Sequence, residues 1–163
     1  LILTCESVKS LTSSASLAQA TMGYRATYIK NETVYFTNFF EIPPSSLHLL
    51  DALFKETGAL NRIVIVVDST HDSAVDDLCH FHAKMDEFML RHDAKKTLQK
   101  VICVASKSDL LVPGEEDYKI ENLREIAEGN DLKFIEFSSR TSWTGALNTL
   151  RKEVLVPVGM LLS

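Results

Sequence analysis

The sequence predicts one α/β domain, with a six-stranded, mostly parallel sheet that has one antiparallel hairpin strand and about five helices. Short apolar runs alternate along the chain with longer amphipathic stretches, a pattern typical of α/β proteins. Three of the runs are continuously hydrophobic, as expected for parallel strands that are buried on both faces. The 163 residues, 45% hydrophobic and 24% charged, suffice for one core but not for two. We therefore expect residues 1–163 to form a single domain.

Six segments have the character of strands. The short apolar run Leu1–Thr4 predicts the first strand. Residues Tyr24–Lys30 and Thr33–Phe40 alternate between apolar and polar and are separated by a short polar turn, which predicts an antiparallel hairpin. The three continuously hydrophobic runs predict the buried parallel strands, and they are Ile63–Val67, Val101–Ala105 and Phe134–Phe137.

Five segments are predicted to be helices. The clearest begins behind Pro43-Pro44, where a serine can cap the first turn and Leu47, Leu50 and Phe54 repeat at helical spacing. In the longest segment, apolar residues lie on one helical face and charged residues on the other. The predicted helices are Ser7–Ala20, Ser45–Glu56, Ser73–Lys96, Ile120–Glu128 and Trp143–Val154.

The charge balance and the length of the apolar runs exclude several classes of protein. Seventeen Lys and Arg against twenty-two Asp and Glu give a net charge of -5. Affinity for a nucleic-acid backbone comes from clustered positive charge, so we expect protein partners and no nucleic acid. The stretches Ile63–Val67 and Val154–Leu162 fall short of the roughly 20 residues that a membrane span requires. We expect no transmembrane segment, and peripheral membrane association through a partner stays open.

The cysteines indicate a reducing compartment. Cys5, Cys79 and Cys103 are odd in number and far apart in the sequence, which favours free thiols. We therefore expect a cytoplasmic protein, with the cytosolic face of a membrane as a further location. The chain begins in the apolar run Leu1-Ile2-Leu3 without Met, so we also expect its natural N-terminus to be missing.

A polar turn at the end of the second buried strand carries the most specific motif. This turn, Ser106-Lys107-Ser108-Asp109, resembles the guanine-binding Asn-Lys-x-Asp motif of the Ras superfamily of small GTPases, with Ser106 in the place of Asn. The resemblance implies that the Lys107 stem covers the base and that the Asp109 carboxylate accepts two hydrogen bonds from guanine. Such pairing selects guanine because adenine would leave buried polar groups unpaired.

Three other stretches resemble the same family in the expected order. Ile63–Thr70 is similar to the fourth strand of the Arf-like and signal-recognition-particle-receptor-beta-like branches, where Val-Asp-Ser often ends the strand. Phe134–Arg140 is similar to the strand before the Ser-Ala-Lys loop, with Ser138, Ser139 and Arg140 in its three places. The resemblance implies that the Ser139 amide contacts the base carbonyl. Phe40–Pro44 takes the position of the Asp-x-x-Gly switch motif.

Together these matches span essentially the whole chain and imply a three-layer, P-loop-NTPase-like (Ras-like) fold. Within the family, the chain has a distant likeness to the beta subunit of the signal recognition particle receptor. It has a similarly distant likeness to the GTPase-like domain of the alpha- and gamma-adaptin-binding protein, which also lacks a proper phosphate loop.

The phosphate loop is where the sequence departs most from this family. The loop pattern is Gly-x-x-x-x-Gly-Lys-Ser/Thr, and the corresponding stretch Leu3–Ser10 keeps only Lys9 and Ser10. Without glycine the positive φ angles of an amide cradle are disfavoured. Glu6 places a negative charge where the phosphates would lie, and like charges repel.

The switch motif departs from the family in the same direction. Pro44 stands where the family has a glycine whose amide contacts the γ-phosphate, and proline has no N–H to donate. Glu41 replaces the Asp of the motif, and by resemblance Ser10 and Glu41 would be the magnesium ligands. Since no residue is placed to position an attacking water, we identify no catalytic residue.

These departures predict a pseudo-GTPase: a nucleotide-independent scaffold or adaptor subunit that binds protein partners in an intracellular trafficking or transport complex, with no cofactor. Exposed edge strands with aromatic residues are surfaces that proteins use for association. The predicted partner-binding residues lie in the hairpin, and they are Tyr24, Tyr28, Tyr35, Phe36 and Phe39.

Two alternatives stay open. The first is a divergent but working GTP hydrolase that binds GTP or GDP and Mg²⁺ as a molecular switch. Its nucleotide-binding residues would be Lys9, Ser10, Ser106, Lys107, Asp109, Ser138, Ser139 and Arg140. The second is a flavodoxin-like receiver module, which needs an acidic cluster, and Asp68 at the end of the fourth strand is only one acid. Cys79, His80 and His82 could suggest a metal, but their ordinary role is on a partly packed helix face.

Overall fold

The computed structural model describes residues 2–5, 22–30, 33–57, 62–92, 100–112, 114, 116–138 and 149. The strands and helices follow one another in an alternating α/β order after an initial β-hairpin. They are β1 Ile2–Cys5, β2 Met22–Lys30, β3 Thr33–Glu41, the 3-10 turn η1 Pro44–Ser46, α2 Leu49–Thr57, β4 Arg62–Asp68, α3 Ala74–His92, β5 Lys100–Ser106, the 3-10 turn η3 Ser108–Leu110, α4 Glu116–Gly129 and β6 Lys133–Phe137.

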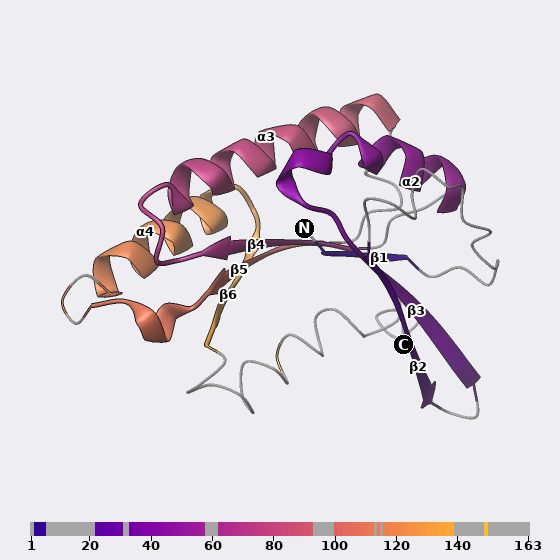
Figure 1. Ribbon diagram of the computed structural model, residues 1–163, viewed down its shortest axis with the longest axis horizontal. Helices are drawn as coiled ribbons and strands as arrows, with labels where there is room; N and C mark the ends of the chain where they lie inside the picture. Colours follow the sequence, from indigo (N-terminus) through magenta and orange to yellow (C-terminus); the bar gives the residue numbers. More distant parts are fainter. Residues whose placement is uncertain are drawn as a thin grey trace.

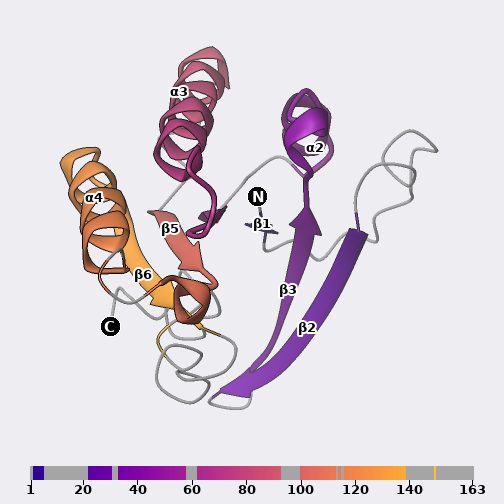
Figure 2. The same ribbon diagram turned by 60° about the vertical axis from the view of Figure 1, so that its left-hand side comes forward.

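The central part of the sheet is parallel and is covered on one face by helices. β4 pairs with β5 and β5 pairs with β6, both in parallel. Helices α2, α3 and α4 lie side by side over the same face of the sheet (Figures 1 and 2). The predicted α/β class is therefore confirmed, as are the three parallel strands. The described strands are hydrogen-bonded in the order β2-β3-β1-β4-β5-β6.

The direction of β1 differs from the prediction. β1 is antiparallel both to β3, where Ile2 pairs with Glu41, and to β4, where Ile2 pairs with Val64. The expectation that antiparallel pairing is confined to the hairpin of β2 and β3 is wrong at this strand. A four-residue apolar run offers the same side chains to the sheet in either direction, so its sequence does not encode the direction.

The predicted hairpin has a continuous antiparallel register from Met22 opposite Glu41 to Lys30 opposite Thr33. Predicted helix ends differ modestly from the observed ones, because η1 precedes α2 and because α4 begins at Glu116 rather than at Ile120. The predicted helices Ser7–Ala20 and Trp143–Val154 lie outside the described residues, Thr149 excepted. Among the helices that the structure describes, none is long and apolar enough to cross a membrane.

Two apolar clusters stabilise the sheet, one on each face. Ile63, Ile65 and Val67 of β4 belong to the cluster beneath the helices, whereas Val64 belongs to the cluster on the opposite face. This alternation is the two-residue period of a strand. Both faces of β4 are therefore apolar, which explains why its sequence is a continuous hydrophobic run.

Helices α2 and α3 are joined by an aromatic contact and by a charged cluster. The ring of Phe54 meets the ring of Phe88 edge-on, with centroids 5.6 Å apart. Asp51 accepts hydrogen bonds from Arg91 Nη1 at 2.8 Å and from His92 Nε2 at 2.6 Å. Partial burial alone would raise the pKa of Asp51, but the hydrogen bonds from His92 and Arg91 hold it below its ordinary value.

A substitution at Phe88 tests this core. Phe88 is fully buried, so we expect Phe88→Ala to lower the free energy of unfolding by about 3–5 kcal/mol, through lost transfer energy and a residual cavity. Leu90 lies on the same helix but is 76% exposed, so Leu90→Ala should change the free energy of unfolding by less than about 0.5 kcal/mol. Urea denaturation measures both, and equal costs for the two variants would contradict this packing.

Thiol labelling tests the burial of β5. Burial raises the pKa of Cys103 to about 12, whereas Cys79 on α3 is exposed. Only a thiolate reacts readily, so in a Cys5→Ser background we expect Cys79 to react with a thiol reagent in the native protein and Cys103 to react only after unfolding. A Cys79→Ser variant that still labels at the same native rate would show that Cys103 is accessible.

Candidate functional site

The register of the parallel strands brings the polar segments of three strand ends to one edge of the sheet. Asp68 at the end of β4 pairs with Ser106 at the end of β5, and Ser106 pairs with Phe137 at the end of β6. Lys107 and Ser138 therefore emerge at the same level as Ser69. In open α/β sheets this carboxyl edge is where ligands bind.

Two serines lock the ends of β4 and β5 together. The backbone amide of Ser69 donates to the carbonyl of Ser106 at 3.0 Å, and the Ser69 hydroxyl donates to the same oxygen at 2.7 Å. In return the Ser106 hydroxyl donates to the carbonyl of Val67 at 2.8 Å. The Ser106 side chain, which replaces the Asn of the resembled motif, is thus engaged with the backbone of the neighbouring strand.

Lys107 turns back across the strand ends. Its φ of 61° is in the left-handed region, which costs a non-glycine residue roughly 1–2 kcal/mol. The turn carries its ammonium to Asp68, where Nζ lies 2.5 Å from Oδ2. The Lys107 side chain remains 55% exposed, so its aliphatic stem is open to solvent while its charge is paired.

Asp68 is the electrostatic centre of this edge. Its other oxygen, Oδ1, accepts hydrogen bonds from the Thr70 amide at 3.1 Å and from the Thr70 hydroxyl at 2.6 Å. Partial burial would raise the pKa of Asp68, but the hydrogen bonds from Lys107 and Thr70 outweigh it and lower the pKa to about 2. The imidazole of His71 lies 3.9 Å from Oδ2. Asp68 is therefore an anion over the whole physiological range.

The other described residues that are predicted to contact the guanine base are Asp109 and Ser138. Asp109 lies in the 3-10 turn η3, and Ser138 follows strand β6. η3 places Asp109 two residues after Lys107, and the Leu110 amide donates to the Lys107 carbonyl at 3.0 Å. Ser108 is buried, and the Oδ1 atom of Asp109 is shielded from solvent. Ser138, the residue after β6, is also buried.

Among the residues predicted on the phosphate side, the structure describes Glu41 and Pro44. Glu41 is the last residue of β3 and its side chain is exposed. Pro44 begins η1, in which the Ser46 amide donates to the Pro43 carbonyl at 2.9 Å. Four predicted nucleotide-binding residues lie outside the described part of the chain, and they are Lys9, Ser10, Ser139 and Arg140.

The predicted partner-binding residues are described in their backbone only. The register sets Tyr24 opposite Phe39 and Tyr28 opposite Tyr35, so these four positions share one face of the hairpin. Phe36 is opposite Thr27, at a position of the other face. The five residues predicted from the sequence therefore divide between two faces.

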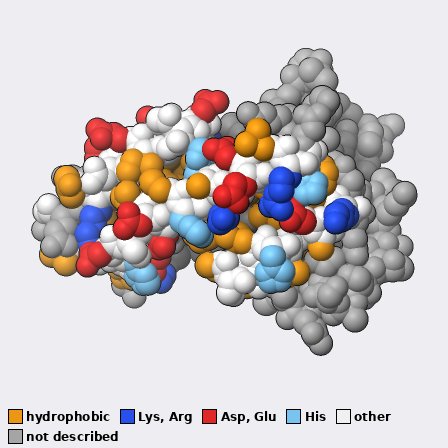
Figure 3. Space-filling view, turned by 90° about the horizontal axis from the view of Figure 1, so that it is seen from above, with side chains coloured by type: hydrophobic (Ala, Val, Ile, Leu, Met, Phe, Trp, Pro, Cys, Tyr) orange, Lys and Arg blue, Asp and Glu red, His pale blue; other side chains and the backbone are white. Residues whose placement is uncertain are grey.

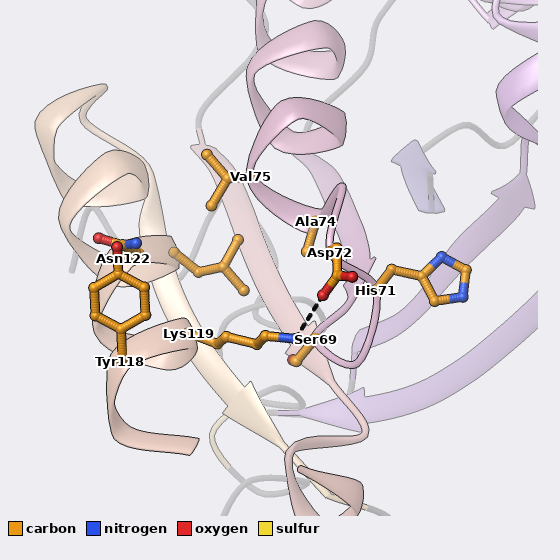
Figure 4. A pocket seen from close by; sticks show the side chains of 9 residues that line it. Ser69, His71, Asp72, Ala74, Val75, Tyr118, Lys119 and Asn122 are labelled. Carbon is orange, nitrogen blue, oxygen red and sulfur yellow. Dashed lines mark hydrogen bonds and ion pairs between the residues drawn. The ribbon is translucent and has the colours of Figure 1, made fainter. Parts of the chain in front are cut away.

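A small cavity lies beside this edge, between the start of α3 and α4 (Figure 4). Its volume is about 130 Å³, and Ser69 connects it with the strand ends. Lys119 of α4 reaches toward Asp72 of the loop before α3, with Nζ 2.8 Å from Oδ1. None of Ser106, Lys107, Asp109 and Ser138 lines the cavity, so it is separate from the predicted guanine-binding residues.

The side chains at the strand ends are mostly polar or charged. Within the described part of the chain, no group of three or more His, Cys, Asp or Glu could hold a metal ion. Lys107 offers an aliphatic stem and Asp109 a carboxylate, both within one turn. Glu41 is the one described residue that was predicted as a magnesium ligand.

The sequence pattern does not identify Asp68 as a residue of the site. There it is only an isolated acid, yet the structure makes it the partner of both Lys107 and Thr70. The sequence nevertheless contains a signal for this ion pair. An acidic residue at the end of one buried strand and a lysine after the next lie close together when the two strands are parallel neighbours.

No protein-family model matches the chain. No curated protein matches its sequence either. The residues at the strand ends and on the surfaces around them therefore carry the functional argument.

Substitution of Asp68 tests the network at this edge. The pKa of Asp68 in the folded protein, about 2, is below the ordinary 3.8, so its charge stabilises the fold above about pH 4. That contribution is lost as the pH falls from about 4 toward 2. Asp68→Asn keeps an oxygen for Thr70 but removes the charge, and we expect a loss of roughly 0.5–1 kcal/mol near pH 7.

Urea denaturation from neutral to acidic pH measures this difference, which should vanish near pH 2. Asp76→Asn on the exposed side of α3 is the matched control. A double-mutant cycle with Lys107→Gln isolates the ion pair. A difference between wild type and Asp68→Asn that is constant across this pH range would contradict the assignment.

Proposed function

We propose that this chain is a Ras-like domain that acts as a nucleotide-independent scaffold or adaptor subunit and binds protein partners in an intracellular trafficking or transport complex. The observation that carries the proposal is Pro44, at the position where the resembled switch motif has its glycine. A residue without an N–H cannot sense a γ-phosphate. Without that sensor, nucleotide hydrolysis would have no effect on the switch segment.

The local structure around Pro44 supports this proposal. The Ser46 amide, a nearby donor that could replace the missing one, is used within η1 by the Pro43 carbonyl. The Glu41 side chain is exposed, and it is one methylene longer than the Asp that the motif has at this position. The segment therefore lacks the amide that contacts the γ-phosphate in working switches, and its carboxylate differs in length from the Asp of the motif.

The sequence at the position of the phosphate loop agrees with the proposal. The stretch Leu3–Ser10 contains no glycine, and Glu6 adds a negative charge. A triphosphate would meet a carboxylate instead of converging amides, which is unfavourable before any cost of desolvation is added.

The surface proposed for partners is the hairpin edge of the sheet. Among the described strands β2 pairs only with β3, so no other described strand covers its second backbone edge, which is nine residues long. An open edge of this length can accept an added strand from a partner. Because no nucleotide orders or releases a switch, this surface would be available at all times.

A second candidate function, guanine-nucleotide binding with hydrolysis as a molecular switch, is favoured by one observation. The ion pair with Asp68 fixes the Lys107 ammonium and leaves the stem exposed at the strand ends, where it could cover a base. Asp109 follows in η3, two residues later. A bound nucleotide would supply its own phosphates, and Mg²⁺ would be held by Glu41 and Ser10 if those residues converge.

Nucleotide titration distinguishes the two functions. We expect no heat in calorimetry and no change in melting temperature on adding GDP or a non-hydrolysable GTP analogue at about 1 mM, with or without Mg²⁺. A micromolar ligand at that concentration would stabilise the fold by about 4 kcal/mol, which raises the melting temperature by roughly 8–16 °C.

The control variants are Asp109→Ala, which removes the guanine-selecting carboxylate, and Asp76→Ala on the exposed side of α3. Binding by the wild type that is lost in Asp109→Ala and kept in Asp76→Ala would overturn the scaffold proposal in favour of a nucleotide switch.

A further inference from the structure

The chain between the end of β3 and the end of α2 contains the position of the resembled switch motif. It leaves β3 at Glu41, passes through η1 and forms α2, which ends at Thr57. A segment that acts as a nucleotide switch must change its position or its order when the γ-phosphate is lost. Three features of the structure oppose such a movement here, and they are a proline connector, a set of buried side chains and a charged clamp.

The connector between β3 and η1 has little rotational freedom. It contains Pro43 and Pro44 in succession, and the proline ring fixes φ at about -65°. Pro43 has φ -62° and ψ 154°, which is the extended conformation expected of a residue before proline. A hinge absorbs a movement through large changes in φ and ψ. The two prolines therefore remove hinge freedom where the chain passes from the sheet to α2.

Buried apolar side chains hold the segment on both sides of the prolines. Ile42 before them and Leu53 after them are 0% exposed, and Leu50 is 3% exposed. All three belong to the core cluster beneath the helices, and Phe54 packs against it. A displacement of α2 would return these side chains to water and lose the free energy of their burial. The helix can therefore leave its place only by opening part of the core.

A charged clamp, formed by Asp51, Arg91 and His92, joins α2 to the end of α3. Arg91 Nη1 donates to Asp51 Oδ2 at 2.8 Å and His92 Nε2 donates to Oδ1 at 2.6 Å, so both oxygens of one carboxylate are engaged. Arg91 is oriented by its own helix, since its Nε donates to the carbonyl of Glu87 at 3.4 Å. Figures 1 and 2 show α2 beside α3, and Figure 3 shows acidic, basic and histidine side chains close together on the outer face of the helices.

Aromatic rings shield one side of the clamp. The His92 ring contacts Phe54 of α2 and Phe88 of its own helix, with ring centroids 5.1 Å and 5.0 Å away. The side chains of His92 and Asp51 are 20% and 29% exposed. A charge-assisted hydrogen bond that is partly withdrawn from water is stronger than an exposed ion pair. The clamp is therefore the polar contact that resists separation of the two helices.

The Asp51 carboxylate keeps its charge throughout the neutral pH range. Burial alone would raise the pKa of Asp51, but the hydrogen bonds from His92 and Arg91 hold it below the ordinary 3.8. Asp51 is therefore ionised above about pH 4. Lys84 and Glu87, also on α3, pair with each other at 3.1 Å and are not bonded to Asp51.

We propose that the chain from Glu41 to Thr57 is a locked switch: α2 and α3 move as one body, and a ligand at the strand ends does not shift α2 between two positions. The inference rests on the proposed function for its interpretation, because a surface that does not change state suits a constitutive scaffold. The lock has several parts, so restoring the glycine of the resembled motif at Pro44 would not by itself restore a switch.

Amide hydrogen exchange followed by NMR tests the lock, because it reports the opening of α2 and of α3 separately. In the wild type we expect the protection factors of Leu53 and Phe54 in α2 to lie within about tenfold of that of Phe88 in α3. Asp51→Ala should lower α2 protection relative to α3 by about tenfold, because charge-assisted hydrogen bonds between the helices are lost. Pro44→Gly alone should keep α2 protection within about threefold of the wild type.

Asp86→Ala is the matched control. Asp86 also pairs with a histidine, since its Oδ2 lies 3.6 Å from His82 Nδ1, but both residues are on α3. Its loss should therefore leave α2 protection relative to α3 unchanged. Wild-type α2 protection more than about tenfold below that of α3 would overturn the lock. A drop in Asp51→Ala that is no larger than the drop in Asp86→Ala would overturn it too.

The same measurement separates this inference from the scaffold proposal. If the protein binds GDP and a non-hydrolysable GTP analogue and α2 protection is the same with either, the scaffold proposal is lost and the lock stands. If it binds neither and α2 opens independently of α3, the lock is lost and the scaffold proposal stands. Protection of α2 that differs between the two bound nucleotides would overturn both.

Discussion

The parallel register of β4 and β5 is the constraint on which the rest of the structure depends. It pairs Arg62 with Lys100 at one end and Asp68 with Ser106 at the other. A slip of one residue would turn Ile63, Ile65 and Val67 to the opposite face of the sheet and separate them from the helices. The hydrophobic cost of such a slip fixes the register, and the register in turn delivers Asp68, Ser69 and Lys107 to the same edge.

The same constraint explains which parts of the fold could be predicted from the sequence. Strands β4, β5 and β6 were predicted within a residue or two, because each contains a short, strongly apolar run, which in β4 and β5 is continuous. The start of α4 was predicted at Ile120, four residues after its observed start, although Glu116 and Asp117 precede it. Acidic residues also favour the positive end of a helix, and here that preference places them in the first turn.

The direction of β1 could not be predicted for a different reason. A run of four apolar residues has no feature that distinguishes a parallel from an antiparallel neighbour, and direction is set by the path of the chain between strands. The start of α2 was predicted four residues early, because the Pro43-Pro44 signal marks the turn η1 rather than the helix itself.

The motif of the candidate site could be predicted, because its residues are consecutive in the sequence. Contacts between residues that are far apart in the sequence could not. The motif Ser106-Lys107-Ser108-Asp109 was found by its pattern, and the structure places it at a strand end as expected. The left-handed backbone of Lys107 and its ion pair with Asp68 depend on a residue 39 positions away. Surfaces built from two elements have no signature in either one alone.

In the proposed scaffold, the strand-end network forms without a nucleotide. Hydrogen exchange of the nucleotide-free protein tests it most directly, because the Ser69 amide is buried and bonded to the Ser106 carbonyl. We expect the Ser69 amide to exchange as slowly as the amide of Val104 in the central strand, and we expect GDP to change neither rate. An amide of Ser69 that exchanges freely until GDP is added would contradict the account, since the edge would then be built by the nucleotide.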